Sequence, residues 1–196
     1  MTQQIFIENG ACSKVFRKNE LIFEEGTNPR FFNYIIKGSV EMYSLSDEGK
    51  EFIQGVFGSN ESFGEPPLFI NMPYPSSARA KEDSEILRLS KDKFIQLLEK
   101  NSELKSHFLE VFAKRIYSKA LGQNSLSHCE PEKRILLFIE KFKFDNQIND
   151  TNMTYLPYTR QELANFTGLR IETIIRTLTK MKQRGTLKFN NKKIII

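Results

Sequence analysis

Arg170, Glu172 and Arg176 bring two cations and a carboxylate together over a short stretch of the C-terminal third. The N–H groups of an Arg guanidinium match guanine O6 and N7, and a Glu carboxylate accepts a hydrogen bond from cytosine N4. Ile171 and Ile175 lie between them, and an exposed Ile can contact a thymine methyl group. These residue types predict the reading of base edges rather than catalysis.

A short helix and a tight turn are predicted just before these residues. Thr159 and Glu162 have capping-box spacing, in which each side chain accepts a hydrogen bond from a free backbone N–H at the helix start. Gly168 suits the turn, and Ala164 is small enough for a second helix to pack closely. The predicted inward residues of this first helix are Leu163, Phe166 and Thr167.

A second helix is predicted from about Arg170 to Arg184, with Gly185 after its end. Its apolar positions, which recur at helical spacing, are Ile174, Leu178 and Met181. A hairpin follows, with strands at Thr186–Phe189 and Lys192–Ile196 and a turn at Asn190-Asn191. A solvated amphipathic helix is the simpler interpretation of the polar face. It does not account for the capping box, turn and hairpin together, which indicate DNA binding.

Positive charge is concentrated in the same region. Residues 131–196 contain 13 Lys and Arg against 6 Asp and Glu, a net charge of +7. The chain totals are 29 and 24, so residues 1–130 hold 16 against 18, a net charge of −2. Basic charge beside a helix-turn-helix is the electrostatic footprint of phosphate contacts.

The motif resembles the DNA-binding motif of the cyclic-AMP receptor/fumarate-nitrate regulator (Crp/Fnr) superfamily. The likeness lies in Thr159-Arg-Gln-Glu-Leu-Ala and in Gly168-Leu-Arg-Ile-Glu-Thr-Ile-Ile-Arg176. It implies a bacterial transcription regulator in which Glu172 and Arg176 contact a G·C pair and its neighbour in TTGA-like half-sites.

Residues 1–90 are predicted to form an all-β unit, because short β-rich runs alternate with turns that contain Gly, Asn or Pro. The runs are Leu21–Phe23, Phe31–Ile36, Ser39–Leu45, Glu51–Phe57 and Ile86–Leu89. This segment resembles the cyclic-nucleotide-binding β-roll of the same superfamily. The matching positions are Gly26, Tyr34-Ile35-Ile36, Gly38, Val40, Gly49-Lys-Glu51, Gly58 and Phe63-Gly-Glu65.

Two helices are predicted after the β-roll, at Lys91–Lys100 and from about Ser102. The longer one carries an apolar stripe, part of which must pack on the β-roll. The resemblance implies that this helix pairs with its symmetry mate in a homodimer, which also suits a helix-turn-helix that reaches two half-sites. The predicted dimer residues are Phe108, Val111, Phe112 and Ile116.

The predicted fold class is α+β with two domains. Residues 1–126 form the β-roll with a dimerisation helix at about 102–126, and residues 127–196 form the winged helix-turn-helix. The hinge is predicted at Ser125–Pro131, followed by a helix at Glu132–Phe142 and a wing strand at Met153–Leu156.

The composition predicts a cytoplasmic protein without a membrane partner. Mean hydropathy is −0.43, and no apolar run approaches the roughly 18 residues of a spanning helix. The N-terminus lacks the basic-then-apolar layout of a signal peptide. Two Cys do not make a disulfide framework.

Cyclic AMP is not expected as the effector. The resemblance implies that, in cyclic-AMP-binding relatives, a Phe-Gly-Glu loop holds the ribose and a following Arg holds the phosphate. Tyr74-Pro75 stands where that Arg is expected, and strand alternation places Arg79 differently. Burying the phosphate without a cation would cost several kcal/mol. An unknown small-molecule effector stays open, and its candidate pocket residues are Phe63, Gly64, Glu65, Ser76 and Ser77.

No cofactor or metal site is predicted. An iron–sulfur cluster needs about four Cys ligands, whereas haem stays open with His107, His128, Cys12 and Cys129 as candidate axial ligands. The sequence contains no nucleophile elbow, Walker loop or paired-carboxylate motif, so it does not indicate an enzyme.

The predicted DNA contacts fall into two sets. The base-reading residues are Arg170, Ile171, Glu172, Ile175 and Arg176. The phosphate-contacting residues are Thr159, Arg160, Gln161, Thr173, Lys180, Lys192 and Lys193. The predicted partners are double-stranded DNA, a second copy of the chain and, for an activator, RNA polymerase. The alternative is a ligand-sensing or interaction module with only non-specific DNA binding.

Overall fold

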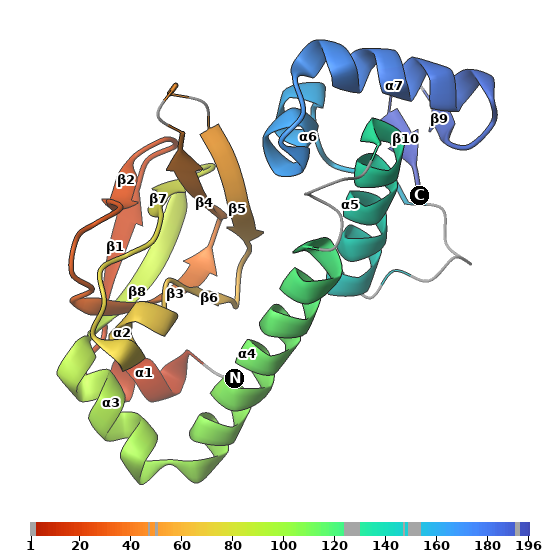
Figure 1. The fold of residues 1–196 in the computed structure, drawn as a ribbon. Helices are drawn as coiled ribbons and strands as arrows, with labels where there is room; N and C mark the ends of the chain where they lie inside the picture. Colours follow the sequence, from red (N-terminus) through yellow and green to blue (C-terminus); the bar gives the residue numbers. More distant parts are fainter. Residues whose placement is uncertain are drawn as a thin grey trace. The chain divides into compact units, whose positions relative to one another are not determined.

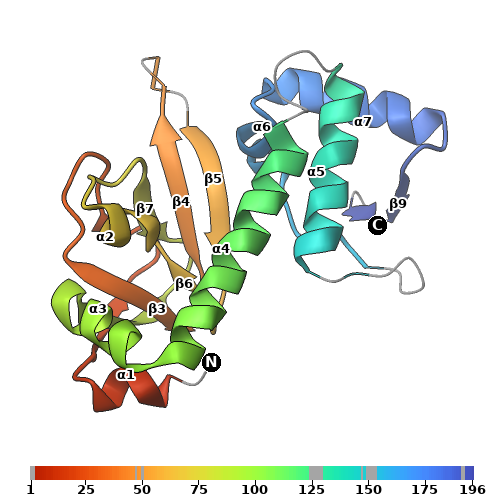
Figure 2. The ribbon, with the colours of Figure 1, turned by 60° about the horizontal axis from the view of Figure 1, so that its bottom comes forward.

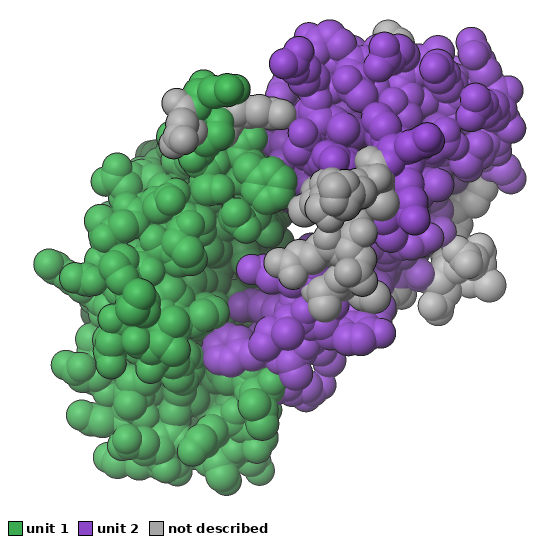
Figure 3. Space-filling view, in the orientation of Figure 1, with its two compact units in different colours: residues 1–109 green, residues 110–196 purple. Residues whose placement is uncertain are grey.

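The computed structural model describes residues 3–46, 48–49, 51–123, 130–146, 148, 154–190 and 193–196. The chain divides into two compact units, Met1–Leu109 and Glu110–Ile196, each described here by itself (Figure 3). The predicted domain boundary between residues 126 and 127 lies outside the described residues.

The first unit consists of short strands and helices (Figure 1). In chain order they are α1 (Gln4–Glu8), β1 (Cys12–Phe16), β2 (Leu21–Phe23), β3 (Phe31–Lys37), β4 (Val40–Leu45), β5 (Glu51–Phe57), β6 (Ser62–Phe63), α2 (Pro66–Ile70), β7 (Ser77–Ala80), β8 (Ser84–Ser90) and α3 (Lys91–Lys100). Helix α4 (Ser102–Gln123) begins in this unit and continues into the next.

The strands form two antiparallel sheets, in the orders β1-β8-β3-β6 and β2-β7-β4-β5. Apolar side chains from both sheets meet in one buried core, formed by Phe16, Ile22, Ile35, Val40, Phe63, Ala78, Ala80 and Ile86. The predicted β-roll and α+β fold class are confirmed.

The other face of β3 packs against helices α1, α3 and α4 (Figure 2). The rings of Phe32 and Phe94 stack with their centroids 4.1 Å apart. Phe6 lies 5.4 Å from Tyr34, and each of these four aromatic side chains is at most 1% exposed.

The five strands predicted in this unit correspond to β2, β3, β4, β5 and β8. Strands β1, β6 and β7 and helices α1 and α2 were not predicted. Four of the five residues of β1 are exposed, and β7 is built largely from small side chains. Neither strand therefore shows the apolar alternation on which a strand prediction depends.

The second unit contains the rest of α4, three further helices and a two-stranded sheet. These elements are α5 (Pro131–Asp145), α6 (Arg160–Thr167), α7 (Ile171–Gln183), β9 (Lys188–Asn190) and β10 (Lys193–Ile195). Their common core comprises Ile135, Ile139, Leu156, Leu163, Ala164, Ile174, Leu178, Met181, Leu187 and Ile194. No described helix is both long and apolar enough to cross a membrane.

Candidate DNA interface

Helix α6 begins with the predicted capping box. The Thr159 hydroxyl accepts a hydrogen bond from the Glu162 backbone N–H at 3.1 Å, and Glu162 Oε2 accepts one from the Thr159 N–H at 2.7 Å. Thr159 is in an extended conformation, as an N-cap requires. The two side chains thus satisfy two backbone donors that the helix leaves free.

The predicted turn is also confirmed. Gly168 follows α6 with φ +67°, in the left-handed region that favours glycine. Ala164 is 1% exposed within the core. Tyr158 supports the start of α6 by packing against Phe138, Phe142 and Phe166, with ring centroids 5.0–5.5 Å apart. Burial raises the pKa of Tyr158 to about 12.

Helix α7 has one buried and one exposed side. The predicted core residues Ile174, Leu178 and Met181 are at most 3% exposed, and Thr177 is buried with them. The side chains on the other side are Glu172, Ile175, Arg176, Thr179 and Lys180, all exposed. The core therefore fixes which side of α7 is available for contact.

The structure brings four of the five predicted base-reading residues to this exposed side. Arg170 is the N-cap residue of α7, and Ile175 is 51% exposed. Glu172 and Arg176 are one helical turn apart, and neither makes an ion pair with any residue that the structure describes. Their hydrogen-bonding groups are thus free for another molecule.

Ile171 is less exposed than Ile175. Its side chain is partly buried, because it packs against the core of the second unit. Its place in the base-reading set stays a prediction. The helical periodicity of the sequence does not distinguish Ile171 from Ile175.

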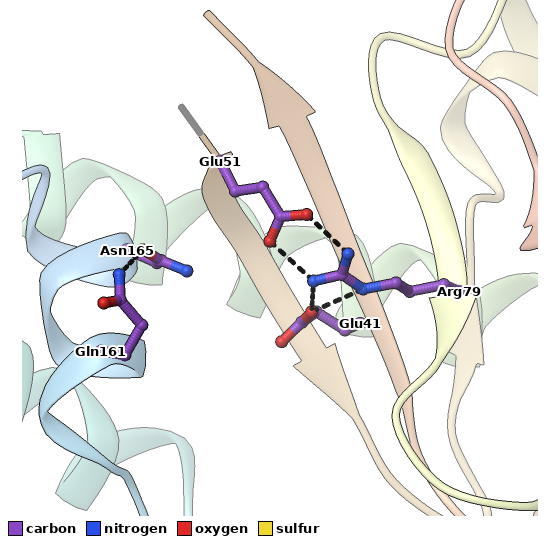
Figure 4. Close-up of polar contacts among 5 residues, drawn as sticks. All are labelled: Glu41, Glu51, Arg79, Gln161 and Asn165. Atoms are coloured by element: carbon purple, nitrogen blue, oxygen red, sulfur yellow. Dashed lines mark hydrogen bonds and ion pairs between the residues drawn. The ribbon is translucent and has the colours of Figure 1, made fainter. Parts of the chain in front are cut away.

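The predicted phosphate contacts occupy the ends and flanks of the helix pair. Thr159, Gln161, Lys180 and Lys193 are exposed, whereas Arg160 and Thr173 are partly buried, and Lys192 lies outside the described residues. Gln161 donates to Asn165 on the exposed side of α6 (Figure 4). The Arg160 guanidinium lies 5.7 Å from the centre of the Phe189 ring, and burial lowers its pKa.

The wing is a small sheet at the end of the chain. Strands β9 and β10 pair antiparallel, and Tyr155 bridges Ile195 next to them. Thr154 and Leu156 make backbone hydrogen bonds to Ile196 and Ile194, so the described part of the predicted Met153–Leu156 strand pairs with β10 through an isolated bridge, outside the two-stranded sheet. Asn190 is the last residue of β9 and pairs with Lys193, so its assignment to the turn was wrong.

Replacing Thr159 with Ala should destabilise the second unit by about 1 kcal/mol, because one helix-end N–H loses its acceptor. Urea unfolding of the full chain, monitored by a signal from the second unit, measures this loss of unfolding free energy. Thr179→Ala is the matched control, since Thr179 only donates to the Ile175 carbonyl within its own helix. Equal effects of the two substitutions would contradict the capping role.

The predicted effector pocket lies around an aromatic stack. Tyr74 is 4% exposed, and its ring stacks on Phe23 with centroids 3.7 Å apart and planes 6° apart. A Cβ added at Gly64 would lie 2.8 Å from Phe23 Cζ and 3.3 Å from Tyr74 Cε1. The two rings therefore fill the space beside Gly64.

The other residues predicted for this pocket are buried as well. Phe63 and Glu65 are 0% exposed, and Ser76 and Ser77 are 2% and 9% exposed. The Ser77 hydroxyl accepts a hydrogen bond from the Glu25 N–H at 3.0 Å. The structure brings these residues together at the start of α2 and of β7.

Arg79 is held by two carboxylates (Figure 4). Its Nη2 lies 2.7 Å from Glu41 Oε1, and its Nη1 lies 2.6 Å from Glu51 Oε1. The hydrogen bonds from Arg79 lower the pKa of Glu51. Arg79 is thus part of an ion-pair network across β7, β4 and β5, in agreement with the expectation that it does not replace the missing phosphate contact.

The predicted dimer stripe on α4 needs one correction and one addition. Phe108 is 3% exposed, because its ring packs edge-on against Phe94 at 5.3 Å, so it belongs to the core of the first unit. Val111 and Phe112 are partly buried. Ile116 is 69% exposed, and Leu109, which was not predicted, is 72% exposed.

The two candidate haem ligands that the structure describes lie on different elements, Cys12 on β1 and His107 on α4. Cys12 is exposed, His107 lies beside Phe108, and His128 and Cys129 lie outside the described residues. Within the described ranges, no three His, Cys, Asp or Glu side chains are placed to hold a metal ion.

Comparison with known families identifies both units. Residues 13–101 match the cyclic nucleotide-binding domain, and residues 134–196 match the Crp-like helix-turn-helix domain. The chain belongs to the Crp/Fnr family of transcription regulators, with a cyclic nucleotide-binding-like domain followed by a helix-turn-helix DNA-binding domain.

Individual relatives cover almost the whole chain. The transcriptional activator protein FnrA of Stutzerimonas stutzeri is 25% identical over 92% of this chain and 74% of its own length. The cAMP-activated global transcriptional regulator CRP of Pasteurella multocida is 26% identical over 100% of this chain and 94% of its own length.

A solved structure shows the same fold. The c-di-GMP-responsive global regulator CLP of Xanthomonas campestris is 24% identical, with a TM-score of 0.77 over 98% of this chain and 96% of that one.

Proposed function

We propose that the protein is a sequence-specific transcription regulator that reads DNA with α7. The observation that carries this proposal is the exposure of Glu172 and Arg176, one turn apart and without ion pairs among the described residues. The major groove admits an α-helix, where Arg matches guanine and Glu matches cytosine. Ile175 supplies an apolar contact for a thymine methyl group.

The proposed DNA-binding form is a homodimer joined through α4. Leu109 and Ile116 are seven residues apart, so they lie on the same side of the helix, and both are exposed. A second copy of α4 would bury this apolar pair. A two-fold dimer reads a palindromic operator whose half-sites lie about one helical turn apart, and we propose TTGA-like arms.

The proposed effector is not cyclic AMP, and the regulator either takes another small molecule or none. Tyr74, which stacks on Phe23 beside Gly64, stands where the resemblance predicts a phosphate-binding Arg. Arg79 is bound to Glu41 and Glu51. Neither position therefore provides a cation for a cyclic phosphate.

Calorimetric titration of the full-length protein with cyclic AMP should give no saturable heat at micromolar nucleotide, because the stacked rings of Tyr74 and Phe23 occupy the place of the phosphate-binding Arg. DNA titrated into the same preparation is the control for active protein. A binding isotherm with cyclic AMP would show that the Tyr74 side chain moves aside, and would refute this part of the proposal.

The proposed role places the protein in the cytoplasm with DNA, and in contact with RNA polymerase if it activates transcription. A ligand-sensing or interaction module with only non-specific DNA binding is the competing function. The free Glu172 and Arg176 side chains favour sequence reading, since phosphate contacts alone need no carboxylate on the exposed side of α7.

Selection of binding sites from a pool of random DNA duplexes tests the proposed function. Purified protein without added effector should enrich a two-fold symmetric site with TTGA-like arms. Salt-sensitive binding without any enriched sequence would support the interaction-module alternative, provided that a repeat with added cell metabolites also enriches none.

A further inference from the structure

A polar cluster lies inside the β-roll, at the end where β3 and β8 meet the segment before β7. Asn33 is 1% exposed and stands directly opposite Arg88 in the antiparallel ladder. Side chains of such pairs project from the same face, with Cβ atoms about 4.5–5.5 Å apart. Tyr74 lies close to Asn33, Arg88 and Glu65, which all affect the pKa of its hydroxyl.

Two buried atoms of this cluster have no hydrogen-bond partner among the described residues. They are Asn33 Oδ1, an acceptor, and Arg88 Nε, a donor. The Asn33 amide orientation is fixed, because its Nδ2 donates to the Phe31 carbonyl at 3.2 Å. The reverse orientation would set two carbonyl oxygens against each other. Buried polar atoms left unpaired in this way indicate a bound group.

Arg88 also lacks a counter-ion. Its guanidinium lies 4.1 Å from the centre of the Phe31 ring, and burial lowers its pKa. It makes no ion pair with any residue that the structure describes, whereas Arg79 in the same unit is held by two carboxylates. The cluster thus offers a positive charge at Arg88 and one acceptor oxygen on Asn33.

We propose that the cluster of Asn33, Tyr74 and Arg88 binds an α-amino acid. The carboxylate of the ligand accepts a hydrogen bond from Arg88 Nε and neutralises the guanidinium. Its ammonium group donates to Asn33 Oδ1, the buried acceptor that has no partner among the described residues. Arg88 is only partly buried, so it connects the site to solvent.

Simpler occupants fit the cluster less well. A water molecule can satisfy both unpaired atoms, but it leaves the Arg88 charge without a counter-ion. A simple anion pairs with Arg88, but it sets a second acceptor against Asn33 Oδ1, which stays without a donor. A ligand with both charges matches both sides. The inference does not depend on DNA reading.

Glycine is the smallest probe of this chemistry, with acetate and methylammonium as its two halves. The Arg Nε–H signals of the ¹⁵N-labelled full-length protein are followed by NMR while each probe is added at constant ionic strength. The Arg88 signal is the one that Arg88→Lys removes. Arg17→Lys is the matched control, because Arg17 is exposed and pairs with Asp83.

The expected result is a saturable shift of the Arg88 signal with glycine, and binding of acetate and methylammonium at least about tenfold weaker. Arg17→Lys should leave the glycine response unchanged. An Arg88 signal that does not respond to glycine, or that responds equally to acetate, would overturn the proposal. Both outcomes are read on the unmodified protein, and Arg88→Lys serves only to assign the Arg88 signal.

Discussion

Replacing Arg176 with Ala is expected to weaken binding to the symmetric operator by about 2–6 kcal/mol, because each half-site loses one two-pronged base contact worth about 1–3 kcal/mol. Arg176 is exposed on α7 and makes no ion pair with any residue that the structure describes. The substitution should therefore leave the fold intact. Fluorescence anisotropy with the selected operator measures the loss.

Base-substituted operators distinguish reading from simple charge loss. The Arg176→Ala protein should no longer distinguish the base pair that Arg176 reads in each arm. It should therefore bind operators substituted at that base pair as tightly as it binds the original operator. Lys180→Ala is the matched control, since it also removes one exposed positive charge from α7. It should weaken binding to all sequences alike and reduce the salt dependence. If Arg176→Ala behaved in the same way as Lys180→Ala, Arg176 would be a phosphate contact.

Introducing Glu at both Leu109 and Ile116 is expected to separate the proposed dimer. Two exposed apolar side chains on one side of α4 would become charges that face their symmetry mates. A monomer reaches only one half-site, so affinity for the full operator should fall by about 10²–10⁴-fold. Sedimentation and operator binding measured on the same sample test both consequences.

Lys105→Glu is the control for this double substitution. Lys105 is an exposed residue of the same helix, so the change reverses a charge without removing apolar surface. It should leave the sedimentation and the operator affinity close to those of the unmodified protein. A double variant that still sediments as a dimer would assign the interface to another surface.

The helix-turn-helix was predictable because its determinants are local. The Thr159–Glu162 box needs only the spacing of two residues, and Gly168 marks its own turn. Ile174, Leu178 and Met181 repeat at helical spacing and form the core as expected. The exposed side of α7, with Glu172 and Arg176, follows directly from that core.

Other features depend on contacts between distant residues. Phe108 belongs to the same predicted apolar stripe of α4 as the exposed Ile116, but its ring packs against the rings of Phe94 and Phe32 in the core. Ile171 differs from Ile175 only through the core that packs on it. The stack of Tyr74 on Phe23 joins segments about fifty residues apart, and no local pattern records it.

The most direct test of sequence reading by α7 is the ratio of two affinities at physiological salt. One duplex carries TTGA and TCAA arms about one helical turn apart, and the other has the same composition in scrambled order. For a sequence-specific regulator we predict tighter binding to the symmetric duplex by about 10³-fold or more. Equal affinities, with the same salt dependence on both duplexes, would contradict sequence reading by Glu172 and Arg176.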